Sequence, residues 1–303
     1  MIPNRLKKGD IVGVVALSSC IKEHNIPEME RAKKLLEECG LEVKYGKNLF
    51  LDSTGYGATA KEKAEELNEM FGDKNIKAIF NAKGGANSNS IFDYIDYKLI
   101  KNNPKIFCGY SDTTSVSNII TEKTGLITFS GNNFKSFGTD ETDYSYREMI
   151  KRFIQKDLLL GNKDDEYKTI QTGETVGELI GGNLSLISRL VEGKYKIDFQ
   201  DKILFIEELW LESDPEMVSN YLYYMKQNEV FEKVRGIWVG NYEGDVALEK
   251  ILLDTLDGEY DFPIIKSNNF GHGDRRTVIP IGTKAKIDTN NERKIELLED
   301  CIK

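Results

Sequence analysis

The chain has 303 residues, of which 40% are hydrophobic and 30% charged, and its 50 acidic residues outnumber its 41 basic ones to give a net charge of −9. This composition excludes a disordered chain, and the acidic balance argues against partners such as nucleic acid or an anionic membrane. No apolar run reaches the ~18 residues of a membrane span, and the polar start lacks the core of a signal peptide. We therefore expect a cytoplasmic protein of about two domains.

The first half of the chain alternates apolar runs with amphipathic stretches. Because strands separated by helices pair through right-handed crossovers, this order predicts an α/β fold with a mostly parallel sheet. Thr59 and Glu62 form a capping-box pattern that opens one of the helices. The predicted strands cover residues 11–17, 41–45, 76–82, 105–108 and 126–129.

The middle of the chain changes character. Residues 131–170 are rich in polar side chains and hold one amphipathic stretch near 145–157, which is typical of a connector between domains. Apolar runs then return, with predicted strands at 175–180, 202–206, 236–239 and within 278–287, and a helix that begins at Pro215. We predict an N-terminal domain over residues 1–135, a connector over 136–170 and a C-terminal domain over 171–303.

The segment Lys105–Thr114 places an apolar strand, a tight turn and a helix in succession. A serine in such a turn is raised above the end of the sheet, close to free backbone N–H groups that can hold an oxyanion. Ser111 is therefore a candidate nucleophile, although Thr113 stands where the usual nucleophile-elbow pattern has glycine. The simpler alternative is that Ser111 or Asp112 only caps the helix.

A serine nucleophile needs a base and a group that orients the base. His272 is one of only two histidines, with His24, and it lies in a glycine-flanked loop that can bring the imidazole close to another surface. The alternative for His272 is an exposed loop histidine. Glu207 ends an apolar strand, and a carboxylate there usually pairs or reacts. The adjacent Glu208 is an alternative candidate for the group that orients the base.

A glycine-rich loop follows the third predicted strand. Gly84 and Gly85 permit close approach of the backbone to a ligand, and the N–H of Gly85 can supply one oxyanion donor. Phosphate binding is a weaker alternative, because no nucleotide-loop glycine pattern is present. Ser19 and Lys22 form an S-x-x-K pattern, which can pair a nucleophile with a lysine base but is common by chance. Scattered cysteines and two distant histidines give no metal-ligand spacing, so we expect neither a metal nor a cofactor.

Ordered blocks along nearly the whole chain resemble the LD-carboxypeptidase family of serine peptidases. The blocks are Lys8-Gly9-Asp10, Gly84-Gly85, Asn103-Pro104-Lys105 with Gly109–Asp112, Leu179–Leu184, Ile203–Glu207, and Gly271-His272-Gly273 with Ile279–Gly282. The resemblance implies a flavodoxin-like N-terminal domain with a mostly parallel sheet and a smaller, β-rich α/β C-terminal domain, with the active site in the cleft between them. It also implies a homodimer.

The same resemblance implies a catalytic triad. Ser111 would be the nucleophile, His272 the general base and Glu207 the orienting residue. The backbone N–H groups of Gly85 and Asp112 would form the oxyanion hole. The expected reaction is hydrolysis of an amide bond near a peptide C-terminus through an acyl-enzyme.

Two branches of the family suggest different substrates. Murein tetrapeptide carboxypeptidases remove a terminal D-alanine in cell-wall recycling and commonly carry Arg-Gly-Gly-Tyr-Gly in the glycine block. This chain instead reads Lys-Gly-Gly-Ala-Asn-Ser-Asn from Lys83, which resembles the microcin C immunity branch, whose members cleave peptidyl-aminoacyl nucleotides. The candidate substrate-binding residues are Lys83, Gly84, Asn87 and Trp210.

Two of these assignments have open alternatives. The indole of Trp210 could stack on a nucleotide base or only pack at the domain junction. The chain as a whole could also be a murein tetrapeptide carboxypeptidase, or a non-catalytic protein that binds a peptide in the same cleft.

Overall fold

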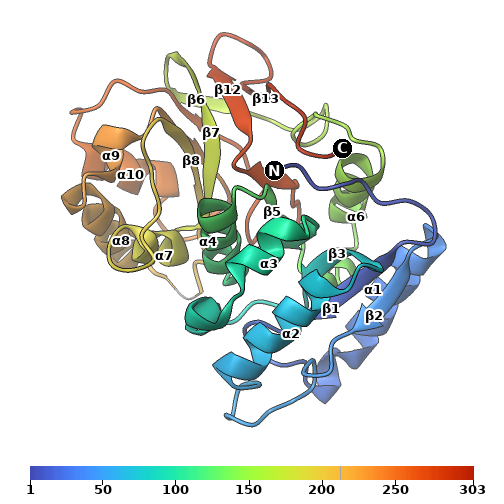
Figure 1. The fold of residues 1–303 in the computed structure, drawn as a ribbon. Coiled ribbons are helices and arrows are strands. Elements are labelled where there is room, and N and C mark those ends of the chain that lie inside the picture. The colour runs from blue at the N-terminus through green and yellow to red at the C-terminus, as the bar shows by residue number, and fades with distance from the viewer. Residues whose placement is uncertain (212) are drawn as a thin grey trace.

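The computed structural model describes residues 1–211 and 213–303, which form two sheets with helices packed on them (Figure 1). The first sheet has six strands in the order β11-β5-β4-β3-β1-β2. Five of them come from the first half of the chain and pair in parallel, whereas β11 runs antiparallel to β5. The strands are β1 (Ile11–Val15), β2 (Glu42–Tyr45), β3 (Ile76–Asn81), β4 (Ile106–Gly109), β5 (Thr128–Ser130) and β11 (Ile279–Ile281). A segment from the end of the chain therefore completes the first sheet.

The second sheet has seven strands in the order β13-β12-β7-β8-β9-β10-β6. Its central four, β7 to β10, are parallel, and β6, β12 and β13 pair antiparallel at the two sides. The strands are β6 (Lys168–Gln171), β7 (Glu174–Asn183), β8 (Lys202–Glu207), β9 (Gly236–Val239), β10 (Ile264–Lys266), β12 (Lys284–Asp288) and β13 (Ile295–Leu297). The prediction of an α/β fold with mostly parallel strands is confirmed.

The helices begin where local signals place them. At α2, Thr59 and Glu62 form the predicted reciprocal box, with backbone-to-side-chain distances of 2.9 and 3.3 Å. At α8, Pro215 is the first residue and Asp214 caps the helix. The helices are α1 (Ile26–Glu38), α2 (Ala60–Gly72), α3 (Tyr97–Asn102), α4 (Thr113–Thr124), α5 (Phe134–Phe137), α6 (Tyr144–Met149), α7 (Leu184–Ile187), α8 (Pro215–Gln227), α9 (Val230–Lys233) and α10 (Leu248–Leu256). None of the described helices combines the length and apolar character needed to cross a bilayer.

The connector holds a shorter helix than the sequence pattern predicts. The amphipathic stretch predicted at 145–157 forms α6 and a π-helical turn, Ile150–Ile154. The helix ends early because Lys156 adopts a φ of 61°, in the left-handed region that no α-helix continues through. The buried side chains of Met149 and Phe153 still anchor this stretch in the core, as the apolar pattern indicated.

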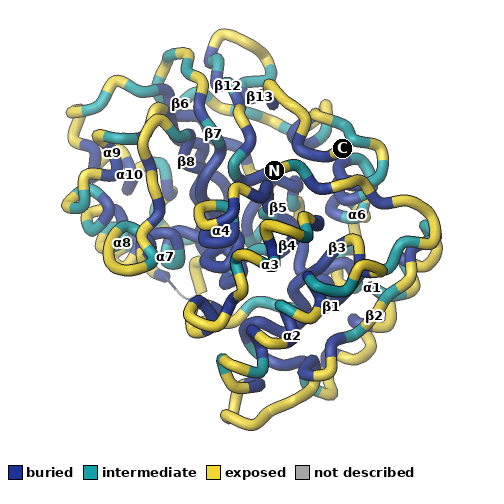
Figure 2. The backbone as a smooth tube through the Cα atoms, in the orientation of Figure 1, coloured by how far each residue is buried: buried dark blue, intermediate teal, exposed yellow. Residues whose placement is uncertain are grey.

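The two halves of the chain contribute jointly to the apolar core. Each of the two large clusters of buried side chains contains residues from both halves, and Figure 2 shows central strands such as β8 largely buried, whereas the edge strand β2 is intermediate or exposed. Helix α4 joins the halves directly: Asn118 bonds the backbone of Gly181 on β7, and the Thr114 hydroxyl accepts from the N–H of Asn183 at 3.0 Å. The start of α4 therefore lies against the carboxyl end of β7, next to β8.

Candidate active site

Ser111 lies in a strained turn between the buried strand β4 and helix α4. Its φ is 59°, a conformation that costs a non-glycine residue about 1–3 kcal/mol and that clusters at functional sites. The Asn133 amide holds the turn, because its Oδ1 accepts from the Tyr110 N–H at 3.3 Å and from the Thr113 hydroxyl at 3.2 Å. Within the described chain the Ser111 hydroxyl has no hydrogen-bond partner, so it is free to react.

The backbone of the glycine loop covers this hydroxyl closely. A Cβ atom on Gly84 would lie 3.1 Å from Ser111 Oγ, which is tighter than ordinary packing. The N–H groups of Gly85 and Asp112 donate to no acceptor in the described residues. Gly85 lines the same cavity as Ser111, and Asp112 follows Ser111 in the chain, so both N–H groups lie near the turn, and their role as oxyanion donors stays a prediction.

The alternative that Ser111 or Asp112 only caps α4 is wrong. The N-cap residue, Asp112, makes no side-chain hydrogen bond to the helix. Its buried carboxylate instead accepts from the Ser18 hydroxyl and from the N–H groups of Asn87 and Ser88, at 2.9 and 2.8 Å. Asp112 thus ties the glycine loop and the loop after β1 to the turn that carries Ser111.

His272 and Glu207 are in direct contact. His272 Nδ1 lies 2.7 Å from Glu207 Oε2, and the Glu207 side chain is only 3% exposed. Since a carboxylate only accepts, Nδ1 carries the hydrogen and Nε2 is left as the basic nitrogen. Gly271 makes the contact possible, because its φ is 102° and a Cβ atom there would lie 2.8 Å from the Glu207 side chain.

Glu208 has a different set of partners. Its carboxylate accepts from Asn183 Nδ2 at 2.7 Å, from the Ser185 N–H at 2.7 Å and from the Leu209 N–H at 2.8 Å. Burial, and next the charge of Glu207, raise the pKa of Glu208. Glu208 therefore anchors the start of α7, and Glu207 is the carboxylate that meets the imidazole.

Tyr110 links the two parts of the site. Its ring centroid lies 5.2 Å from that of the His272 imidazole, and Ser111 is the next residue in the chain. No hydrogen bond among the described residues joins Ser111 to His272. The structure thus brings Glu207 and His272 together, and Ser111 follows the tyrosine whose ring contacts His272.

A cavity of about 390 Å³ opens in front of Ser111. Of the predicted binding residues, Lys83 and Gly84 line it. Asn87 does not line it, because its side-chain oxygen faces the buried Lys63 ammonium at 3.4 Å. Trp210 is 46% exposed and lies outside this lining. Contacts of Asn87 and Trp210 with substrate stay predictions.

Sequence reasoning missed several residues of the site. Asn133 holds the Ser111 turn, and the cavity is also lined by Lys135 and Arg276. Asn133 follows β5 at the edge of the sheet where β4 ends, and this position is the signal that could have found it. Arg276 lies four residues after His272 in the same loop, and this closeness to a candidate catalytic residue is the signal that could have found it.

The competing candidates do not form a catalytic pair. Lys22 pairs with Asp52, and this hydrogen bond raises the pKa of the Lys22 ammonium, which makes it a poor base for Ser19. His24 is exposed in a short 3-10 turn. Across residues 1–211 and 213–303, no three His, Cys, Asp or Glu side chains converge as metal ligands.

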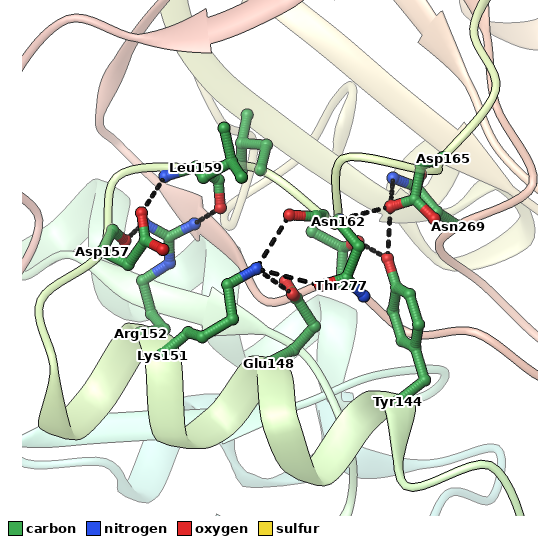
Figure 3. A network of polar contacts seen from close by, with 12 residues as sticks. Tyr144, Glu148, Lys151, Arg152, Asp157, Leu159, Asn162, Asp165, Asn269 and Thr277 are labelled. Atoms are coloured by element: carbon green, nitrogen blue, oxygen red, sulfur yellow. Dashed lines mark hydrogen bonds and ion pairs between the residues drawn. The ribbon is translucent and has the colours of Figure 1, made fainter.

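The connector holds the loop that carries His272 (Figure 3). A backbone hydrogen bond of 2.7 Å from Thr277 to Asn269 closes this loop at its base. The Asp165 carboxylate accepts from the Tyr144 hydroxyl at 2.5 Å and from Asn269 Nδ2 at 3.0 Å, and the same hydroxyl lies 3.0 Å from Thr277 Oγ1. The polar connector therefore fixes both ends of the His272 loop.

An α/β fold that carries a serine at a strained strand–helix turn and a carboxylate-bound imidazole is typical of serine-dependent hydrolases. The comparisons with known proteins agree with this class. Residues 12–131 match the LD-carboxypeptidase N-terminal domain, and residues 176–287 match the LD-carboxypeptidase C-terminal domain. The chain belongs to the LD-carboxypeptidase family and is a serine-type carboxypeptidase or amide hydrolase.

Relatives of two kinds are similar over nearly their full length. A probable murein peptide carboxypeptidase of Bacillus subtilis is 32% identical, covering 95% of this chain and 91% of that protein. The microcin C7 self-immunity protein MccF of Escherichia coli is 30% identical, covering 98% and 95%. A solved structure of MccF in complex with aspartyl sulfamoyl adenosine matches with a TM-score of 0.89 and 27% identity, covering all of both chains.

We expect kcat/KM to rise with pH through a single protonation step whose midpoint lies above the ordinary histidine value of about 6.5. Burial lowers the pKa of His272, but the Glu207 carboxylate, through its charge and the hydrogen bond it accepts, raises it by more, so the pKa lies above its ordinary value. A general base must be neutral, so activity falls as pH drops through this pKa. Rates measured from about pH 5 to about pH 9 check this expectation.

Protonation of His272 should affect folding stability in the opposite sense to activity: stability should fall as pH rises. Because the folded-state pKa of His272 is raised, the charged pair stabilises the fold fully below the unfolded-state pKa of about 6.5, and this contribution is lost as pH rises through the folded-state pKa. Thermal unfolding over the same pH range is therefore the control for activity lost through unfolding. A flat rate profile between about pH 5 and about pH 8 contradicts His272 as the base.

Proposed function

We propose that this protein hydrolyses an amide bond near the C-terminus of a peptide through an acyl-enzyme on Ser111. The observation that carries the proposal is the 2.7 Å contact between His272 and Glu207, at the junction where Tyr110 joins this pair to the strained Ser111 turn. Nucleophilic catalysis by serine needs an imidazole that is oriented by a carboxylate and can reach an unpartnered serine hydroxyl.

In this proposal Ser111 Oγ attacks the scissile carbonyl carbon while His272 Nε2 takes the hydroxyl proton. Glu207 orients the imidazole and stabilises its protonated form. The N–H groups of Gly85 and Asp112 hold the oxyanion, and such donors contribute about 3 kcal/mol each in related enzymes. His272 then gives its proton to the leaving nitrogen. Water attacks the acyl-enzyme with His272 again as the base, which frees the product acid and Ser111.

We propose cleavage of peptidyl-aminoacyl nucleotides, of the microcin C immunity type, as the first candidate reaction. The glycine block of this chain, from Lys83 to Asn89, resembles that branch, and MccF binds an aspartyl nucleoside analogue. The exposed indole of Trp210 has the apolar face that stacking on a base requires. A cytoplasmic location and a homodimer stay predictions of the same resemblance.

Removal of D-alanine from a murein tetrapeptide is the second candidate. The Bacillus subtilis relative, a probable murein peptide carboxypeptidase, is as similar to this chain as MccF is. The cavity in front of Ser111 supports both candidates, because a basic lining suits either a peptide carboxylate or a phosphate.

Two measurements test the proposal. A serine-reactive fluorophosphonate should label the wild-type protein once, at Ser111, as located by peptide mass mapping. The kcat/KM for an aspartyl-adenylate-type amide should exceed that for a tetrapeptide ending in D-alanine. The reverse ranking favours the murein reaction. Tight peptide binding without labelling or turnover would instead indicate a binding protein.

A further inference from the structure

The cavity in front of Ser111 is positively charged in a chain that is negative overall. The ionisable side chains that line it, apart from the Tyr110 phenol, are Lys83, Lys135 and Arg276, and no Asp or Glu of the described chain lines it. The chain as a whole carries a net charge of −9. Cations gathered without counter-charges in a concave site raise the local concentration of anions and bind them more strongly than they would in open water.

Among the described residues, one of the three cations has an acidic partner. Lys135 lies 3.3 Å from the Glu28 carboxylate. Within the described residues, Lys83 and Arg276 make neither an ion pair nor a side-chain hydrogen bond. Burial lowers the pKa of Lys83, and the charge of Lys135 lowers it further, so the surroundings of Lys83 disfavour its positive charge. A bound anion would relieve this repulsion.

Arg276 is held in a position that suits planar recognition. Its guanidinium carbon lies 4.9 Å from the centroid of the Tyr110 ring, and its Nε is buried without a partner. The remaining guanidinium N–H groups form a fork that matches the two oxygens of a carboxylate or phosphate. Because Tyr110 precedes Ser111, such an anion would lie close to the reacting serine.

We infer that this cavity is an anion subsite in which Arg276, assisted by Lys83, binds a carboxylate or phosphate oxygen on the leaving side of the scissile amide. The inference rests on the proposed role of Ser111. Both candidate substrates carry an anion on that side: the free carboxylate of a C-terminal residue, or the phosphoryl group of a nucleotide. In this subsite Arg276 selects substrates whose leaving group is an anion. No sequence pattern predicts this role for Arg276.

The test compares substrates that differ only in the charge of the leaving side. For the wild-type protein, a tetrapeptide with a free C-terminal carboxylate should be cleaved with a kcat/KM about 100-fold above that of its C-terminal amide. Arg276→Gln should remove most of this preference, by lowering the rate for the acid and leaving that for the amide within about threefold. An aspartyl amide with and without its phosphoryl group forms the second arm and identifies which anion the subsite serves.

Arg275→Gln is the matched control. Arg275 is adjacent in sequence, but its side chain is 53% exposed and pairs with Asp165 outside the cavity, so its loss should change kcat/KM less than threefold on either substrate. A second readout is the pH profile. The charge of Arg276 lowers the pKa of His272, so Arg276→Gln should shift the activity midpoint to higher pH.

The possible outcomes separate this inference from the proposed function. Loss of the acid preference in Arg276→Gln supports the subsite. An unchanged preference overturns it, as does an equal loss on acid and amide in a variant that unfolds at the wild-type temperature. If wild-type protein shows no acid preference in either arm, the subsite is also overturned, whatever the variants do. Turnover that persists in Ser111→Ala would instead overturn the proposed function.

Discussion

Ser111→Ala is expected to lower kcat for amide hydrolysis by about 10⁴-fold or more while the fold is retained. The substitution removes the only atom that can form the acyl-enzyme in the proposed mechanism, and the imidazole and oxyanion donors that remain give only residual catalysis. Retention of the fold follows from the contacts, because the Ser111 hydroxyl has no hydrogen-bond partner among the described residues. Turnover and thermal unfolding, measured on the same preparation, check both parts.

Ser111→Gly serves as the matched control for backbone strain. Both variants lose the hydroxyl, but only glycine relieves a φ of 59°, so the glycine variant should unfold at a higher temperature than the alanine variant. Ser19→Ala tests the rival nucleophile, and its rate should stay within about tenfold of wild type because Lys22 is committed to Asp52. Acylation that persists in Ser111→Ala and vanishes in Ser19→Ala would refute the assignment.

The parts of this protein that could be predicted from sequence are those encoded by local physics. The capping box at Thr59 fixes the start of α2, and the buried run before Gly109 fixes β4 and the turn that carries Ser111. The alternation of strands and helices then determines that most strands run parallel. Threonine at position 113, where the elbow pattern has glycine, does not prevent the turn from forming, because the left-handed backbone conformation lies at Ser111 itself.

The choice between Glu207 and Glu208 could not be made from local sequence. Adjacent residues along a strand point to opposite faces of the sheet, so only one of the two carboxylates can face the His272 loop. Which of them does so depends on which face of the sheet each residue of β8 is turned toward. The same limit applies to β11, whose partner β5 lies about half the chain away, and to Arg276, whose partner Tyr110 is equally remote. Such contacts exist only after the two halves pack together.

Glu207→Gln and Glu208→Gln should fail in different ways. We expect Glu207→Gln to lower kcat by about 10³- to 10⁴-fold, because an amide cannot stabilise the imidazolium and can hold the imidazole in the wrong tautomer. Its effect on stability should be small, since the glutamine oxygen can still accept from His272 Nδ1 at the present 2.7 Å contact. Kinetics on folded protein measure this effect, and the midpoint of the acid limb in the pH profile should move to lower pH, because the Glu207 charge that raises the pKa of His272 is gone.

Glu208→Gln should instead lower the free energy of unfolding by about 1–3 kcal/mol with kcat within about tenfold of wild type. The carboxylate receives three donors, from Asn183, Ser185 and Leu209, and an amide NH₂ in place of one oxygen would face a donor and leave it unsatisfied. Chemical denaturation of the two variants side by side provides the comparison. If Glu208→Gln loses turnover while Glu207→Gln keeps it, the orienting role belongs to Glu208, and the contact between Glu207 and His272 has no part in catalysis.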